Sequence, residues 1–110
     1  MLYNHILALI LIIVLFLLWR HSCKPIYWFF RESCPYCVSM KDEWTKFKYM
    51  TMFSMIMPID VDIATTEGQH LSKLFSVSSV PTLVKMNKNI PTIYNGTRKA
   101  HDIYLWAIQN

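Results

Sequence analysis

The feature that most constrains the fold of this chain is a pair of cysteines, Cys34 and Cys37, between a strand-like run and a helix-like run. Residues 26–30, which precede the pair, are aromatic and apolar, as is typical of a short buried β-strand. After the pair, apolar residues recur at steps of three and four, which predicts a helix with one buried face: Cys37, Met40, Trp44 and Phe47. Pro35 falls in the first turn, where a missing N–H is tolerated. Cys34 is therefore expected at the helix N-terminus.

A cysteine in that position differs chemically from an ordinary thiol. The unpaired N–H groups and the dipole of the helix favour the thiolate, so we expect the pKa of Cys34 to lie below the free value of about 8.5. Cys34 is then the exposed nucleophile, and Cys37, one turn further in, is the more buried resolving thiol. The CxxC spacing alone leaves a second chemistry open, because it can also be half of a zinc site. The four histidines have no metal-ligand spacing to the pair or to each other, so no metal ligand is predicted within the chain.

Residues 2–19 are almost entirely apolar and are interpreted as a transmembrane anchor. As a helix they would span about 27 Å, close to the thickness of a bilayer core. The alternative, a cleaved signal peptide, usually has a basic start and small residues at its cleavage site, and both are missing here. Residues 20–25 are predicted to be a juxtamembrane linker, and residues 26–110 to be the folded domain.

The residues beyond the apolar run bear on topology and on modification. Arg20, His21 and Lys24 follow the run, and the positive-inside rule therefore favours a single-pass protein with its domain on the cytosolic side. Asn95-Gly96-Thr97 is an N-glycosylation sequon, and a glycan on Asn95 would indicate the opposite orientation, with the domain in the lumen. Cys23 is separate from the CxxC. It could be acylated, could form a disulfide with a second chain, or could be a free thiol without a role.

The remaining patterns predict a mixed sheet covered by helices. Strands are expected at residues 57–63, 80–86 and 90–94, with a turn at 87–89 suited to positive φ. A short helix should start at Thr66 or Gly68, and a final helix should start near Thr97. These helices are expected to bury apolar side chains at the following positions: Leu71, Leu74 and Phe75 in the first, and Ile103, Leu105 or Trp106, and Ile108 in the second. The order β-α-β-α-β-β-α indicates an α/β domain.

Charge and methionine content bear on two possible functions, nucleic-acid binding and copper binding. The net charge of +4 comes from 11 basic and 7 acidic residues without a long basic run, so nucleic-acid binding is not predicted. Four methionines lie within residues 50–57. Thioethers can bind copper(I), but methionine more often fills irregular core space or forms an adaptable contact surface.

Taken together, these patterns resemble the thioredoxin superfamily over residues 24–109. One part of the resemblance is the strand, the CxxC and the helix that follows it. Another is residues 74–82, which end in Val80-Pro81-Thr82 and are similar to the helix end and cis-proline strand of that family. The third is residues 94–106, which are similar to the closing stretch of protein disulfide isomerase domains. The resemblance implies a thioredoxin-like fold, a mixed central sheet flanked by helices, here preceded by a transmembrane helix.

The same resemblance implies a thiol–disulfide oxidoreductase with assigned residues. Cys34 would be the nucleophile and Cys37 the resolving thiol, and Pro35 and Tyr36 would shape the site. Other implied roles lie 45 residues downstream: Pro81 would be cis beside the sulfurs, and Val80 and Ser79 would bind an extended substrate. Protein dithiols or disulfides and a redox partner would exchange two electrons with the Cys34–Cys37 disulfide, and no other cofactor is implied.

The sequence departs from the family at Trp28, at Ser33 and at the dipeptide Pro35-Tyr36. The dipeptide Pro35-Tyr36 is that of glutaredoxins, and Ser33 stands where thioredoxins carry tryptophan. Trp28 stands where the family usually has a buried acid that assists proton transfer. Two other classes remain as alternatives. One is a metal or iron–sulfur module held by the CxxC across a dimer, and the other is an adaptor of the same fold that binds a partner without turnover.

Overall fold

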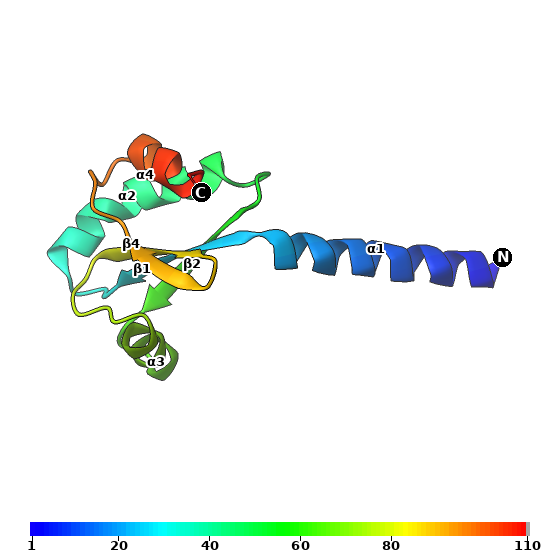
Figure 1. The fold of residues 1–110 in the computed structure, drawn as a ribbon, viewed down its shortest axis with the longest axis horizontal. Helices are drawn as coiled ribbons and strands as arrows, with labels where there is room; N and C mark the ends of the chain where they lie inside the picture. The colour runs from blue at the N-terminus through cyan, green and yellow to red at the C-terminus, as the bar shows by residue number, and fades with distance from the viewer. Residues whose placement is uncertain (110) are drawn as a thin grey trace.

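The structure is a computed structural model, and it describes residues 1–109. A long N-terminal helix leads into an α/β domain (Figure 1). The elements follow the chain in this order: α1 (Leu2–Ser22), β1 (Lys24–Phe30), α2 (Pro35–Met50), β2 (Ile56–Asp62), α3 (Thr66–Leu74), β3 (Thr82–Asn87), β4 (Ile90–Ile93) and α4 (Ala100–Ala107).

The strands form one mixed sheet in the order β2-β1-β3-β4. β1 pairs with β2 in parallel, as the helix between them requires, and with β3 antiparallel. β4 returns from β3 through a tight turn in which Lys88 and Asn89 have φ values of 52° and 67°. The expected mixed sheet flanked by helices is therefore confirmed, including the positive φ values in this turn.

Helices cover both faces of the sheet, and this explains why β1 is so apolar. α2 and α4 lie together on one face, and α3 lies on the other (Figure 1). Alternate residues of β1 point to opposite faces, so Ile26 and Trp28 pack with α2 and α4, whereas Phe29 packs with Phe75 on the α3 side. The predicted face of α2 is confirmed, because four of its side chains are buried: Cys37, Met40, Trp44 and Phe47.

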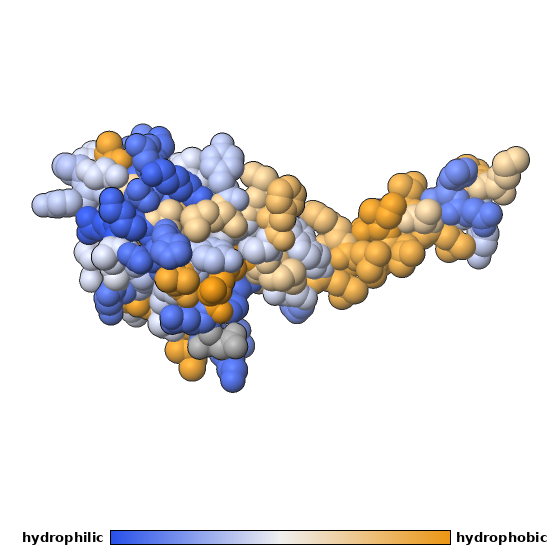
Figure 2. Space-filling model, turned by 90° about the horizontal axis from the view of Figure 1, so that it is seen from above, coloured by the Kyte–Doolittle hydropathy of each residue, from blue (hydrophilic) through white to orange (hydrophobic). Residues whose placement is uncertain are grey.

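α1 projects away from the domain, and none of its side chains is buried. Its 21 residues would span about 30 Å, and the mean hydropathy of its apolar window is 2.5. By length and composition, α1 can cross a membrane. Its apolar surface is visible in Figure 2 as the orange arm beside the mainly blue and white domain.

The expected linker at residues 20–25 has a different structure. α1 continues through Ser22 and β1 begins at Lys24, so only Cys23 separates helix from strand. The hydroxyl of Ser22 donates to the Leu18 carbonyl, and the basic residues Arg20 and His21 fall in the last turn, where they favour a helix C-terminus. The helix therefore extends past the apolar run.

Two predicted helix faces are wrong in part. α4 begins at Ala100, not near Thr97. The prediction holds for Ile103, which is buried, and for Trp106, which is partly buried against the core, but Leu105 and Ile108 are exposed, and Ala100 and Ala107 are buried instead. The buried residues recur at steps of three and four from the true first residue, which turns Leu105 outward. In α3, the helix ends at Leu74, whose side chain is exposed, and Phe75 beyond it is buried.

Candidate active site

Cys34 caps the N-terminus of α2. Its backbone is extended, with φ −81° and ψ 117°, and its sulfur accepts a hydrogen bond of 3.2 Å from the Cys37 N–H. The chain reaches this position through a turn in which the Cys34 N–H donates to the Arg31 carbonyl at 3.1 Å. Pro35 is the first residue of the helix, where a backbone N–H would have no partner within the helix, so its lack of an N–H costs nothing. The first turn of α2 is therefore built around the Cys34 sulfur.

The two CxxC thiols have different surroundings, although they belong to the same turn of the helix. Cys34 is half-buried, whereas the side chain of Cys37 is 2% exposed and packs in the core. A hydrogen bond from the Cys37 thiol and the N–H groups of Cys37 and Tyr36 lower the pKa of Cys34, against a smaller opposing effect of its partial burial. Burial, and then the bond to Cys34, raise the pKa of Cys37 to about 11. Both thiols are free in this structure, as is Cys23.

The segment before β3 meets the CxxC from the other side. The Val80–Pro81 peptide bond is cis, and the Val80 carbonyl lies 3.9 Å from the Cys34 sulfur, although 46 residues separate them. Val80 packs against the core clusters on both faces of the sheet, which holds this carbonyl in place. Ser79 is exposed, and its carbonyl accepts a 2.6 Å hydrogen bond from the Thr82 hydroxyl.

Tyr36 and Arg98 complete the exposed side of the site. The Tyr36 ring is exposed, and the Arg98 guanidinium lies 5.5 Å from its centre. The positive charge of Arg98 also contributes to the lowered pKa of Cys34. Sequence reasoning did not select Arg98, because nothing in its local pattern shows that the loop before α4 returns to the start of α2.

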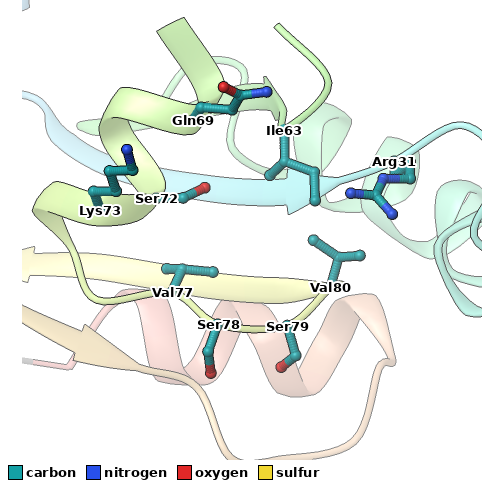
Figure 3. Close-up of a pocket in the computed structure, with 9 residues that line it drawn as sticks. All are labelled: Arg31, Ile63, Gln69, Ser72, Lys73, Val77, Ser78, Ser79 and Val80. Carbon is teal, nitrogen blue, oxygen red and sulfur yellow. The ribbon is translucent and has the colours of Figure 1, made fainter. Parts of the chain in front are cut away.

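A groove of about 480 Å³ runs along the chain from Val77 to Val80 (Figure 3). It is lined on the other side by residues of α3, and Arg31 lies at the end near Val80, while Lys73 lies at the opposite end. Both side chains are exposed, and neither forms an ion pair with another described residue. The groove thus carries two positive charges, and its lining contains no acidic residue.

Trp28 is buried in the same core cluster as Cys37. Both residues line a second cavity of about 310 Å³, together with Asp60 of β2. The Asp60 carboxylate accepts 2.7 Å and 2.8 Å hydrogen bonds from Trp44 Nε1 and Lys48 Nζ. Trp28 Nε1 is buried and has no hydrogen-bond partner among the described residues. Asp60 lies on the neighbouring strand β2, in register with Trp28.

Metal-ligating residues do not gather in the described part of the chain, where no group of three or more histidine, cysteine or acidic side chains could hold an ion. A metal bound by Cys34 and Cys37 would therefore take its other ligands from outside the described residues.

Neither the protein-family models nor the curated proteins contain a match to this chain. Solved structures do match. The J-Trx1 fragment of ERdj5 aligns with a TM-score of 0.69 and 18% identity, over 80% of this chain and 41% of that one. The first thioredoxin domain of mouse protein disulfide-isomerase A4 aligns with a TM-score of 0.67 and 22% identity, over 76% of this chain and 60% of that one. The first two thioredoxin domains of Naumovozyma dairenensis Eps1p align with a TM-score of 0.67 and 20% identity, over 77% of this chain and 34% of that one. This chain therefore spans less than two thirds of each.

Proposed function

Because the chain has the thioredoxin fold, we propose that it is a membrane-tethered thiol–disulfide oxidoreductase that acts on protein substrates through Cys34 and Cys37. The observation that carries this proposal is the contrast between the two thiols. One is accessible and has a lowered pKa at a helix N-terminus, and the other is buried one turn away with a raised pKa. A nucleophilic thiol and a protected resolving thiol need this division.

The proposed reaction transfers two electrons by two displacements. The Cys34 thiolate attacks one sulfur of a substrate disulfide, forms a mixed disulfide and releases the other substrate sulfur as a thiolate. The Cys37 thiol then loses its proton and attacks the Cys34 sulfur, which forms the Cys34–Cys37 disulfide and releases the second substrate thiolate. The substrate is reduced, and the dithiol is oxidised. A redox partner carrying a dithiol reverses the change, and the same steps run backwards oxidise a substrate.

Substrate binding is assigned to the groove that ends at Val80. An extended peptide segment placed along residues 78–80 would bring its cysteine to Cys34, since the Val80 carbonyl lies beside that sulfur. Ser79 would contact the same segment, and Pro81 would leave the adjoining surface free of a backbone donor. Arg31 and Lys73 favour substrates with an acidic residue in this segment.

The tether is assigned to α1. Its length and its uninterrupted apolar run over residues 6–19 support a membrane span, and Arg20, His21 and Lys24 support a cytosolic domain under the positive-inside rule. In that compartment, where thiols are kept reduced, the protein would act as a reductase.

A Cys37→Ser variant of the full chain in membranes tests the proposed function. We expect Cys34 to remain joined to its substrate, because the resolving thiol is gone, as a product that dithiothreitol releases. A Cys34→Ser/Cys37→Ser variant is the matched control and should trap nothing. The proposal fails if Cys37→Ser yields no adduct and the unaltered protein also fails to reduce a model protein disulfide.

A further inference from the structure

The connection between α2 and β2 is an apolar loop on the surface of the domain. This methionine loop (residues 50–55) contains no charged residue. Phe53 is 96% exposed, and the side chains of Met50, Met52 and Met55 are about half exposed. Patches of large apolar side chains on a soluble surface mark interaction sites more often than chance exposure. The loop is therefore not the core filler for which methionine is often used.

Both side-chain hydroxyls of the methionine loop and several of its backbone groups are hydrogen-bonded within the chain. The hydroxyls of Thr51 and Ser54 donate to the carbonyls of Phe47 and Thr51, at 2.9 and 2.8 Å. The backbone N–H groups of Thr51, Met52 and Ser54 also donate to carbonyls of the preceding turn. A segment that meets hydrocarbon must pair its polar groups internally, because lipid tails offer no partners. Water is therefore not needed to satisfy these groups.

The methionine loop is fixed to the base of α1. The Lys24 N–H donates to the Met55 carbonyl at 2.6 Å, and only Cys23 separates Lys24 from the last residue of α1. In Figure 1 the loop after α2 lies on the side of the domain from which α1 leaves. In Figure 2 apolar colours continue from α1 onto the adjoining end of the domain. The apolar surface of the helix and that of the domain thus meet at one place.

We propose that the methionine loop lies in the membrane interface, with Phe53 and the methionine methyl groups at the boundary between headgroups and acyl chains. This rests on the proposed membrane span of α1. Phenylalanine is among the side chains that interfacial segments bury at that boundary, and flexible thioether side chains adapt to a disordered surface. Two attachments, α1 and the loop, would fix the tilt of the domain, which a single helix and a short connection do not.

This orientation sets where the redox site works. The methionine loop follows the C-terminus of α2, and Cys34 caps its N-terminus. The 16 residues of α2 span about 24 Å, so Cys34 would be held about that far above the loop, at the end of the domain away from the bilayer. Substrate segments would be reached at that height and not at the lipid surface.

Methionine methyl NMR tests the proposal without a reporter mutation. The full chain, labelled with ¹³C in its methionine methyl groups, is placed in lipid nanodiscs with and without a phosphatidylcholine that carries a nitroxide near the top of its acyl chains. We expect the nitroxide to broaden Met52 and Met55 strongly. Met40, which is buried near the far end of α2, should keep its signal. Single Met→Leu substitutions assign the signals.

Two variants and the Met1 signal make the outcomes distinguishable. Phe53→Asp should lift the loop and restore Met52, whereas Val38→Asp, at an exposed apolar site near Cys34, should change nothing. The proposal is overturned if Met1 is broadened but Met52 and Met55 are as sharp as Met40, which would show a spanning α1 with the loop in water. It is also overturned if broadening of the loop appears only at high protein-to-lipid ratio without nitroxide, which would indicate contact between copies. If neither Met1 nor the loop responds, the membrane span itself fails.

Discussion

The two CxxC cysteines show how strongly position alone changes a side chain. Both are thiols on the first turn of α2, three residues apart. The Cys34 sulfur accepts hydrogen bonds from the Cys37 thiol and from backbone N–H groups, which lower its pKa. Cys37 is surrounded by core side chains, and this burial raises its pKa. Because the thiolate is the reactive form, this difference supports the proposed order of the two displacements.

Selective alkylation of the reduced full chain should follow that order. We expect iodoacetamide to modify Cys34 first, with a rate that rises with pH around a midpoint below the free cysteine value of about 8.5. As the pH falls through the lowered pKa, Cys34 becomes protonated and the rate declines. Cys37, with a pKa of about 11 and a buried side chain, should stay unmodified near neutral pH. Peptide mass spectrometry measures both, and preferential labelling of Cys37 would contradict the assignment.

The tryptophans Trp28 and Trp44 provide a second comparison at the scale of single residues. Both are buried and in contact, with ring centres 5.6 Å apart, but only Trp44 has a partner for its indole N–H, the Asp60 carboxylate. A hydrogen bond to a charged group contributes about 1.5–3 kcal/mol, whereas a buried donor without a partner costs about 1–3 kcal/mol.

Trp28→Phe should therefore destabilise the domain less than Trp44→Phe. Both changes remove the same ring atoms, so the cavity terms are similar, and the difference reports the N–H group. We expect the two variants to differ by about 1 kcal/mol or more in free energy of unfolding. Urea unfolding of the full chain in nanodiscs, followed by circular dichroism, measures this difference. Equal losses would mean that the Trp28 N–H has a partner in solution.

At the scale of elements, α4 is held at both ends by residues from elsewhere in the chain. The Glu43 carboxylate, on α2, accepts the Ala100 N–H at 2.8 Å at its start. At its end, Lys85 of β3 donates to the carbonyls of Trp106 and Gln109, at 2.7 and 3.1 Å. These contacts satisfy groups that every helix leaves unpaired. They also join α4 to the site, because the loop before it carries Arg98.

Replacement of Glu43 should reveal the first of these contacts through its pH dependence. The Ala100 N–H, with a smaller contribution from Lys46, lowers the pKa of Glu43 in the folded state. Its stabilisation is therefore complete above the unfolded value of about 4.3 and is lost as the pH falls through the lowered folded value. Glu43→Ala should have a lower thermal midpoint than the unaltered protein at pH 7, and the gap should narrow in acid, where the protonated carboxyl keeps only its uncharged acceptor.

The matched control is Glu43→Gln, whose amide oxygen still accepts the N–H but carries no charge. It should lie between the other two proteins at pH 7. A Glu43→Ala gap that persists unchanged at acid pH would rule out the charged cap.

The sequence predicts an element well when the residues that fix its ends and its buried face are close together in the chain, and poorly when they are far apart. The buried face of α2 was predictable, because a helix on a sheet buries one stripe and its start was marked by Pro35. The face of α4 was not, because its start depends on Glu43, 57 residues away. Lys85 is 4% exposed, although a lysine in a strand usually faces water, and only the end of α4 explains it.

The site divides in the same way. The CxxC and Val80-Pro81 were visible as motifs, because each is a short run of neighbouring residues. The groove and Arg98 were not, because they arise where separate loops meet at one end of the sheet.

At the scale of the whole molecule, the two proposed functions lie at opposite ends of the domain: a membrane end at α1 and a redox end at the CxxC. β1 begins directly after α1 and ends just before the CxxC, so the sheet separates the proposed membrane end from the redox end. The sequon at Asn95 belongs to the redox end, where it lines a cavity with Pro81 and Arg98. Asn95 is exposed there, and a glycan would occupy the surface next to the proposed site.

The sequon therefore reports on which side of the membrane the redox end lies. From Arg20, His21 and Lys24 we expect a cytosolic domain, and hence no glycan on Asn95 when the full chain is made with endoplasmic reticulum membranes. A glycosidase-sensitive shift in electrophoretic mobility is the measurement. The matched control carries a second sequon in a polar N-terminal extension, which should be glycosylated if the N-terminus is lumenal. Glycosylation at Asn95 with an unmodified extension would reverse the topology. It would also make substrate oxidation the expected direction, because the site would then face an oxidising compartment.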